Sequence, residues 1–332
     1  MNGACTAPSG RLKILVTGAS GFIGGSFCHR FAKSQDVEIR GIGRRDSGLP
    51  GYSRADLTQP LRLGWQPDLV IHAAARAATW GSLEEFRRQN VLATTHVRDF
   101  CVEQGVGRLI YLSSSSVYYR HEDQLGLTED SPVGPVFLSH YAQTKHEGEQ
   151  VVRDFPGSWT ILRPRAVFGP RDELLLPRLL RAAAQGHLAR ITRPGSPAVG
   201  DLIFIDTLCD YLMRVAINPE ATGIFNLSNG EPVEIQEFIA GLCRRLGYDS
   251  GDRRVSRSTA MRLATSVEGF YRLFLPRREP PLTTFGVSVL SYSKTLDVSR
   301  CLQVLGPPSV SMTEGLNRLI EWQLRSPEEL KA

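Results

Sequence analysis

The sequence predicts an α/β fold in which a doubly wound, mainly parallel sheet carries a smaller, mostly C-terminal lobe. Two observations lead to this prediction. Strand-like and helix-like stretches alternate through the first half of the chain, as they do in parallel sheets with crossover helices. A glycine-rich turn at residues 18–24 also lies directly between the first strand and the first helix. The length of 332 residues is enough for two lobes.

Each strand of the first half is a short run rich in aliphatic residues, and the helices show apolar residues at helical spacing. Strands are expected at 12–16, 37–42, 67–72, 108–112 and 159–162, the last stopped by Pro164. Helices are expected at 22–33, 83–104 and 141–155. The less regular second half predicts helices at 177–185 and 234–246, and short strands at 202–205 and 224–227.

These elements divide the chain into two lobes. We expect a dinucleotide-binding domain over residues 10–168, joined by 202–228. Residues 169–201 and 229–332 are expected to form the substrate-binding lobe, and the small polar residues 1–9 a flexible tail.

The composition restricts the possible functions. The apolar fraction of 42% and the charged fraction of 22% are ordinary for a soluble protein, and the net charge is only +5. The arginines are spread along the chain, so nucleic acid is not an expected partner. Six scattered cysteines without a Cys-x-x-Cys pair favour a reducing cytoplasm and no metal site. No run of about 18 apolar residues is present, so no membrane span is expected.

The glycine turn after the first strand is typical of a Rossmann dinucleotide site. Gly18 permits the tight turn, Gly21 lets the backbone approach the pyrophosphate, and Gly24 lets helix and strand pack closely. Free amides at the helix start bind phosphate. The cofactor contacts expected from this turn therefore include Ser20, Phe22 and Ile23 as well.

The end of the second strand indicates which dinucleotide binds. Enzymes selecting NAD place an acid there for the ribose 2′-hydroxyl, but this chain has Gly43 followed by Arg44 and Arg45. Without a carboxylate, and with two guanidinium groups, the turn favours NADP(H). The alternative is an exposed basic turn beside an NAD(H) site. Asp56 and Leu57 follow the third strand, where Asp56 either accepts a bond from the adenine amino group or closes a strand-end turn.

Tyr141 and Lys145 lie four residues apart on one face of a predicted helix. A tyrosine has an ordinary pKa of about 10, and a neighbouring ammonium is expected to lower it toward neutrality. The serine run Ser113–Ser116 ends the central strand, where ligands bind in parallel sheets. A serine hydroxyl there can donate a hydrogen bond to a substrate carbonyl.

In these motifs the chain resembles the extended short-chain dehydrogenase/reductase family. The matching residues are Thr17-Gly18-x-x-Gly21-Phe22-Ile23-Gly24, Asp56-Leu57, His72-Ala73-Ala74, Asn90-Val91, Ser113–Tyr118, Tyr141-x-x-x-Lys145 and Leu162-Arg163-Pro164. The resemblance implies that Ala73 and Ala74 also contact the cofactor and that the protein is a homodimer through helices near residues 90 and 145.

The same resemblance implies roles for the catalytic residues. Tyr141 would protonate the carbonyl oxygen in reduction, and Lys145 would lower the tyrosine pKa and bond the nicotinamide ribose. Ser114 would polarise the carbonyl, with Ser115 one position away as the alternative in catalysis or as a substrate contact. Sugar-nucleotide dehydratases of the family place Asp-Glu after this serine, whereas this chain has Ser115-Ser116, which argues against dehydration.

The second half is similar to 3β-hydroxysteroid dehydrogenase-like members, in residues 168–180, 280–283 and 292–298. That branch acts on sterols and on β-keto acids or related lipid-like ketones. Arg171 is a candidate for a substrate carboxylate or phosphate, with a surface arginine as the alternative. The apolar helical face over residues 261–274 packs on its own lobe, walls an apolar substrate pocket, or lies on a membrane surface.

The sequence therefore predicts an NADP(H)-dependent enzyme that reduces the ketone of an apolar, sterol-like or β-keto-acyl-like small molecule, or oxidises the alcohol. The alternative is a nucleotide-sugar 4-epimerase or 4-ketoreductase, which needs only the Ser-Tyr-Lys set, although such enzymes usually hold NAD through an acid where Gly43 stands. A third hypothesis, a catalytically silent NADP(H) sensor, needs neither Tyr141 nor Lys145.

Overall fold

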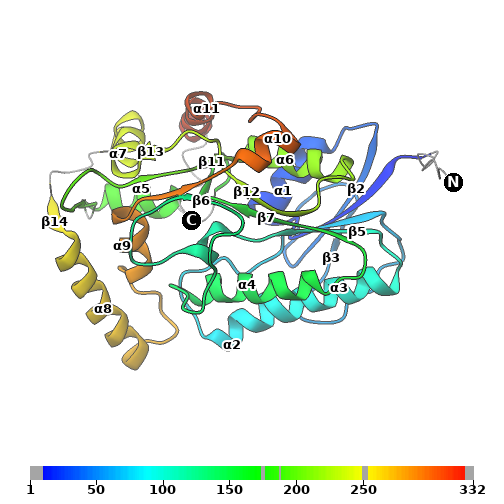
Figure 1. The fold of residues 1–332 in the computed structure, drawn as a ribbon, viewed down its shortest axis with the longest axis horizontal. Coiled ribbons are helices and arrows are strands. Elements are labelled where there is room, and N and C mark those ends of the chain that lie inside the picture. The colour runs from blue at the N-terminus through cyan, green and yellow to red at the C-terminus, as the bar shows by residue number, and fades with distance from the viewer. Residues whose placement is uncertain (1–9, 173–175, 187, 249–252, 326–332) are drawn as a thin grey trace.

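The computed structural model describes residues 10–172, 176–186, 188–248 and 253–325, and a seven-stranded sheet forms its centre (Figure 1). Its order is β12-β7-β5-β4-β1-β2-β3, and every neighbouring pair is parallel. The strands are β1 (Leu12–Thr17), β2 (Val37–Gly43), β3 (Tyr52–Arg54), β4 (Leu69–His72), β5 (Arg108–Leu112), β7 (Ser158–Pro164) and β12 (Gly223–Leu227). The predicted doubly wound parallel sheet is confirmed.

Helices cover both faces of this sheet because successive strand residues point to opposite sides. Ile14 and Val16 of β1 pack in one apolar cluster with Phe27, whereas Leu15 packs in the other with Val97. The first face carries α1 (Phe22–Phe31), α6 (Ile205–Ile217) and α10 (Ser299–Leu305) (Figure 1). The second carries α2 (Leu83–Phe86), α3 (Ala93–Glu103) and α4 (His140–Arg153).

Two predicted elements differ from the structure. The helix predicted over 83–104 contains a stretch of wide π-type turns, η1 (Arg87–Leu92), between α2 and α3. This widened stretch carries the buried Asn90, whose side chain bonds the Arg76 amide at 2.7 Å and the Thr144 hydroxyl at 2.9 Å. The strand predicted over 202–205 is only β11 (Ile203–Phe204), because Ile205 already begins α6.

The second lobe is built on small sheets. A four-stranded sheet has the order β13-β10-β15-β6, with β6 (Gln124–Leu127), β10 (Val199–Gly200), β13 (Val233–Glu234) and β15 (Lys294–Leu296). Residues 124–127, which we expected to lie in the dinucleotide-binding domain, thus pair with strands of the other lobe. A further pair of this lobe joins β9 (Arg190–Thr192) to β14 (Arg254–Ser256). The pair of β8 (Val167–Phe168) with β11 lies in the segments predicted for the dinucleotide-binding domain.

The helices of this lobe are α5 (Leu176–Ala184), α7 (Ile235–Arg245), α8 (Arg257–Phe274), α9 (Thr284–Ser291) and α11 (Met312–Arg325). The predicted helices at 177–185 and 234–246 correspond to α5 and α7. In Figure 1, α8 starts beside β14 and runs along the outer edge of the lobe. None of the described helices is long and apolar enough to cross a membrane.

A buried ion pair fixes α4 to the sheet. Arg163 of β7 donates two bonds to the Glu149 carboxylate of α4, at 2.8 and 2.6 Å, and Ser113 donates a third at 2.5 Å. Both charged side chains are almost completely buried. Despite the cost of burial, the hydrogen bonds from Arg163 and its charge lower the pKa of Glu149 to about 2. The fully paired site therefore holds its carboxylate ionised.

We expect Glu149→Gln to destabilise the protein by about 3–5 kcal/mol at neutral pH, because Arg163 is left buried without its counter-ion. The pKa of Glu149 is depressed, so this stabilisation is complete above about pH 4.5 and is lost as the pH falls toward 2. Urea unfolding at several pH values checks this. Equal destabilisation at pH 7 and at pH 3 would contradict the assignment.

Candidate active site

The serine run and α4 bring three predicted residues together at the carboxyl end of β5. Ser114 lies two residues after the end of β5 and caps the short helix η2 (Ser115–Tyr118) by accepting a bond from the Ser116 amide. Ser139 caps α4 in the same way, with its hydroxyl accepting the Ala142 amide at 3.2 Å. Tyr141 therefore stands in the first turn of α4, and Lys145 follows one turn later.

The two candidate serines point in different directions. The Ser114 side chain is partly exposed and hydrogen-bonds Tyr141. Ser115 is buried, and its hydroxyl is 2.8 Å from that of Tyr119 inside the protein. The geometry therefore favours Ser114 as the serine that acts with Tyr141, and it places Ser115 in a structural hydrogen bond.

Lys145 is almost completely buried, with 1% of its surface exposed. Its Nζ lies 4.0 Å from the centre of the Tyr111 ring, in a cation–π contact. Burial disfavours the ammonium and lowers the pKa of Lys145 to about 7, while the charge of Glu149 acts weakly in the opposite direction. The lysine can therefore both release and accept a proton at neutral pH.

The expected lowering of the tyrosine pKa is wrong for this structure. Burial raises the pKa of Tyr141 to about 12, and the hydrogen bond from Ser114 offsets only part of the rise. Desolvation penalises the phenolate more than the neighbouring groups stabilise it. Tyr141 is therefore a protonated phenol at neutral pH, ready to donate.

A buried hydrogen-bonded chain, which the sequence did not reveal, lies behind this site. The Thr17 hydroxyl is 2.7 Å from His72 Nδ1, and His72 Nε2 is 3.0 Å from the Thr94 hydroxyl. Thr94 donates its own hydrogen to the Asn90 carbonyl, so Nε2 of His72 must be the protonated nitrogen. Burial lowers the pKa of His72 to about 3, so the ring is neutral. These hydrogen bonds join the ends of β1 and β4 to the helices on the second face of the sheet.

The glycine turn has the geometry of a dinucleotide site. Gly18 has φ +70°, and a Cβ on it would lie 2.7 Å from the Ala74 amide nitrogen. A Cβ on Gly24 would lie 2.5 Å from the Gly18 carbonyl. Because β1 and β4 are neighbours with helices on opposite faces, the turn and Ala73-Ala74 meet at the switch point where ligands bind such sheets. The residues at this point fit a bound dinucleotide.

The neighbourhood of Gly43 is crowded, and a side chain at this position would displace its neighbours. A Cβ there would lie 2.6 Å from the Ser20 hydroxyl and 2.9 Å from that of Tyr52. The side chains of Arg44 and Arg45 are exposed beside it. Arg44 bonds Gln89 at 3.3 Å, and Arg45 bonds the carbonyl of Ser20, within the glycine turn, at 3.0 Å. Both guanidinium groups thus border the predicted ribose site.

Two other predicted contacts gain less support. Asp56 accepts the Thr58 amide at 3.0 Å, and this bond lowers the pKa of Asp56 and closes a turn, with Arg44 adding to the effect. Leu57 is buried in the core. Arg171 is exposed, and its charge acts on His29 in the last turn of α1, where burial and Arg171 together lower the histidine pKa. A substrate contact by Arg171 therefore stays a prediction.

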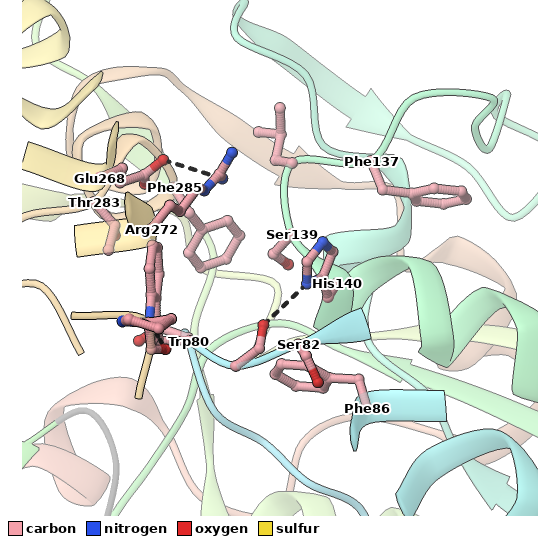
Figure 2. Close-up of a pocket in the computed structure, with 14 residues that line it drawn as sticks. Trp80, Ser82, Phe86, Phe137, Ser139, His140, Glu268, Arg272, Thr283 and Phe285 are labelled. Carbon is pink, nitrogen blue, oxygen red and sulfur yellow. Dashed lines mark hydrogen bonds and ion pairs between the residues drawn. The ribbon is translucent and has the colours of Figure 1, made fainter. Parts of the chain in front are cut away.

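A cavity of about 390 Å³ opens at the start of α4, where Ser139 and His140 form one wall (Figure 2). Tyr141 follows His140 in the sequence but does not line the cavity. Trp80 and Phe285 contribute aromatic surface, and Arg272 of α8 lies 5.7 Å from the centre of the Trp80 ring. Glu268, also on α8, is 3.5 Å from Arg272. The α8 residues that line this cavity are thus the charged Glu268 and Arg272, whereas Met261 and Ala264 of the predicted apolar face pack on their own lobe, as the first of the three sequence interpretations expected. Trp80 lies in an irregular loop, and no sequence signal identified it.

Comparison with known proteins agrees with this geometry. The model of the NAD dependent epimerase/dehydratase family matches residues 14–228, which is more than half of the chain. The chain belongs to the NAD dependent epimerase/dehydratase family. Its sheet, glycine turn and Tyr-x-x-x-Lys helix are those of an NAD(P)-dependent oxidoreductase of the extended short-chain type.

Members of the epimerase/dehydratase family with named activities are similar over most of the chain. A 2-alkyl-3-oxoalkanoate reductase of Stenotrophomonas maltophilia (strain K279a) is 35% identical over 93% of this chain and 98% of its own. The 3beta-hydroxysteroid-dehydrogenase/decarboxylase isoform 1 of Arabidopsis thaliana is 32% identical over 83% of this chain and 67% of its own. Among solved structures, MoeE5 in complex with UDP-glucose and NAD has a TM-score of 0.72 and 25% identity, over 95% and 99% of the two chains.

The burial of Lys145 predicts a pH-dependent effect on stability. Its folded-state pKa of about 7 lies below the ordinary 10.5. Burying the ammonium therefore lowers the free energy of unfolding by its full amount below pH 7, and this cost vanishes as the pH rises toward 10.5. We expect Lys145→Met to be more stable than the wild type at pH 6, by a few kcal/mol. The gain should shrink toward pH 10. Chemical unfolding measures it, with Lys33→Met as an exposed control, and a pH-independent difference would contradict the shift.

Proposed function

We propose that this protein is an NADP(H)-dependent ketoreductase that reduces the ketone of an apolar β-keto acid, or of a sterol-like compound, to the alcohol. The observation that supports the proposal is the hydrogen bond between Ser114 and Tyr141, with Lys145 one helical turn later against the Tyr111 ring of β5. A partly aromatic cavity opens next to this site, with His140 in its wall. The 35% identity to a 2-alkyl-3-oxoalkanoate reductase over almost the full length of both chains supports the substrate class.

The residues divide the proton chemistry among them. Ser114 donates a hydrogen bond to the substrate carbonyl oxygen and holds it beside the phenol. Tyr141 gives its proton to that oxygen, and its raised pKa keeps it protonated at neutral pH, which suits reduction. Lys145 follows one turn later on α4 with a pKa of about 7, and its protonated form stabilises the phenolate that results. The bound dinucleotide supplies the hydride to the substrate carbon.

The cavity supports the proposed substrate class. Phe137 and Phe285 offer apolar contact for an alkyl chain or ring system. Arg272, in a long 3.5 Å pair with Glu268, offers a cation for a substrate carboxylate (Figure 2). A long-chain β-keto acid has both the apolar chain and the carboxylate that these residues can bind, whereas a simple ketone has only the apolar part.

A nucleotide-sugar 4-epimerase or 4-ketoreductase is the second candidate. The likeness to MoeE5 in complex with UDP-glucose and NAD favours it. The crowded Gly43 and the adjacent arginines count against it, because such enzymes usually bind NAD through an acid at that position. A thermal-shift panel with NADP⁺ distinguishes the two: stabilisation by UDP- or dTDP-sugars, but not by long-chain β-keto acids, would favour the epimerase.

Tyr141→Phe should lower kcat for ketone-dependent NADPH oxidation by about 10²–10⁴-fold, because the proton donor is lost. NADPH binding, measured by fluorescence, should be preserved. Ser114→Ala should lower kcat by about 10²-fold. Ser115→Ala is the matched control and should retain most of the activity. Full activity in Tyr141→Phe, or a larger loss in Ser115→Ala than in Ser114→Ala, would contradict the proposed mechanism.

Cofactor choice is tested separately by titration with NADPH and NADH. We expect tighter binding of NADPH, and Arg44→Gln with Arg45→Gln should remove about 1.5–3 kcal/mol for each charge-assisted bond lost to the 2′-phosphate. NADH binding should change little. Arg181→Gln, an exposed arginine on α5, is the control. Equal or tighter binding of NADH by the wild type would refute the NADP(H) proposal.

A further inference from the structure

Helix α8 carries an apolar surface that faces away from the rest of the described chain. Four of its large apolar side chains are more than half exposed: Leu263 (54%), Phe270 (53%), Leu273 (73%) and Phe274 (62%). Residues 263, 270 and 274 share one helical stripe, and 273 lies beside it. The rings of Phe270 and Phe274 are 5.0 Å apart. We call these four residues the α8 ridge.

The ridge is not the result of a loosely attached helix. The other side of α8 buries Ala260 and Ala264 in an apolar cluster with Ile191 and Val287. Ser256 caps the start of the helix by accepting the Thr259 amide at 3.2 Å. Figure 1 shows α8 at the outer edge of the second lobe. The anchored face thus holds the ridge toward the surroundings.

The charge around the ridge is strongly one-sided. Residues 252–279 contain seven arginines and three acids, Asp252, Glu268 and Glu279, although the whole chain carries only +5. Glu279 is paired with Arg178 of α5 at 2.8 Å. Glu268 is turned inward, where its carboxylate accepts the Thr284 amide at 2.7 Å. The arginines are Arg253, Arg254, Arg257, Arg262, Arg272, Arg277 and Arg278.

We propose that the α8 ridge docks this protein on the surface of an anionic membrane. Exposed Leu and Phe side chains flanked by arginines are the features with which a helix lies at a bilayer interface. The apolar side chains enter the boundary between headgroups and acyl chains, and the exposed Arg262, Arg277 and Arg278 meet lipid phosphates. A second copy of the chain fits this surface poorly, because a two-fold contact would place the arginines of one copy against those of the other.

Docking gives the pocket a direct connection to lipid. Glu268 and Arg272 line the cavity from the same helix that carries the ridge. A chain seated on the ridge therefore holds the cavity close to the bilayer, where a long-chain β-keto acid or sterol-like ketone resides. This consequence rests on the proposed function, whereas the docking itself stands on the surface alone.

The test is vesicle sedimentation of the full chain without substrate, so its outcome is independent of the enzymatic activity. We expect binding to phosphatidylcholine vesicles that contain one-third phosphatidylglycerol, and little binding to phosphatidylcholine alone. Replacing Leu263, Phe270, Leu273 and Phe274 by Ser should weaken binding more than about tenfold. Replacing Arg262, Arg277 and Arg278 by Gln should weaken it by up to about fivefold for each arginine.

Matched controls separate docking from general surface effects. Leu125, Val136, Ile217 and Leu324 are equally exposed elsewhere, and their replacement by Ser should leave vesicle binding unchanged. Replacing Arg54, Arg62 and Arg181 by Gln removes the same charge at other sites. Equal binding of the ridge variant and the wild type would overturn the proposal. So would a wild-type dimer that the ridge variant converts to monomers, because the ridge would then be an interface between copies.

Discussion

The buried ion pair between Glu149 and Arg163 is the constraint on which the site depends. It fixes α4 to β7, and through Ser113 to the end of β5, with both charges excluded from water. Arg163 also donates to the Tyr118 hydroxyl at 2.5 Å, and Tyr118 donates to Asn226 of β12 at 2.9 Å. One helix face is thereby held against three strands, which sets how Tyr141 and Lys145 stand relative to Ser114.

Close packing of α4 has a chemical consequence. It buries an amine and brings it against the Tyr111 ring, which lowers the pKa of Lys145, and it raises the pKa of the neighbouring Tyr141 phenol. The same loss of water therefore shifts the pKa values of the two groups in opposite directions. In the proposed reduction, the protonated phenol delivers its proton to the carbonyl oxygen, and the lysine that titrates near neutrality follows it on the same helix face.

Much of this arrangement follows from the sequence. The sheet is encoded in aliphatic runs and Gly18, and the spacing of Tyr141 and Lys145 places them on one helix face. The sequence could not show that burial outweighs the lysine charge at Tyr141, since desolvation depends on the whole packed environment. The widened turn at Asn90 and the Trp80 wall of the pocket also depend on tertiary contacts. For α8, the sequence indicated an apolar face. The structure shows that the charged Glu268 and Arg272 line the cavity, whereas the α8 ridge is exposed.

Burial, rather than a charged partner, sets the pKa values of Tyr141 and Lys145 on α4. The most direct measurement is NMR titration of protein labelled with ¹³C at lysine Cε, since the chain has only five lysines and Lys145→Met identifies the signal. The account predicts that Lys145 titrates with a midpoint near 7, as its pKa of about 7 requires. A midpoint near the ordinary value of about 10.4 would contradict it, because the amine would then be solvated or paired.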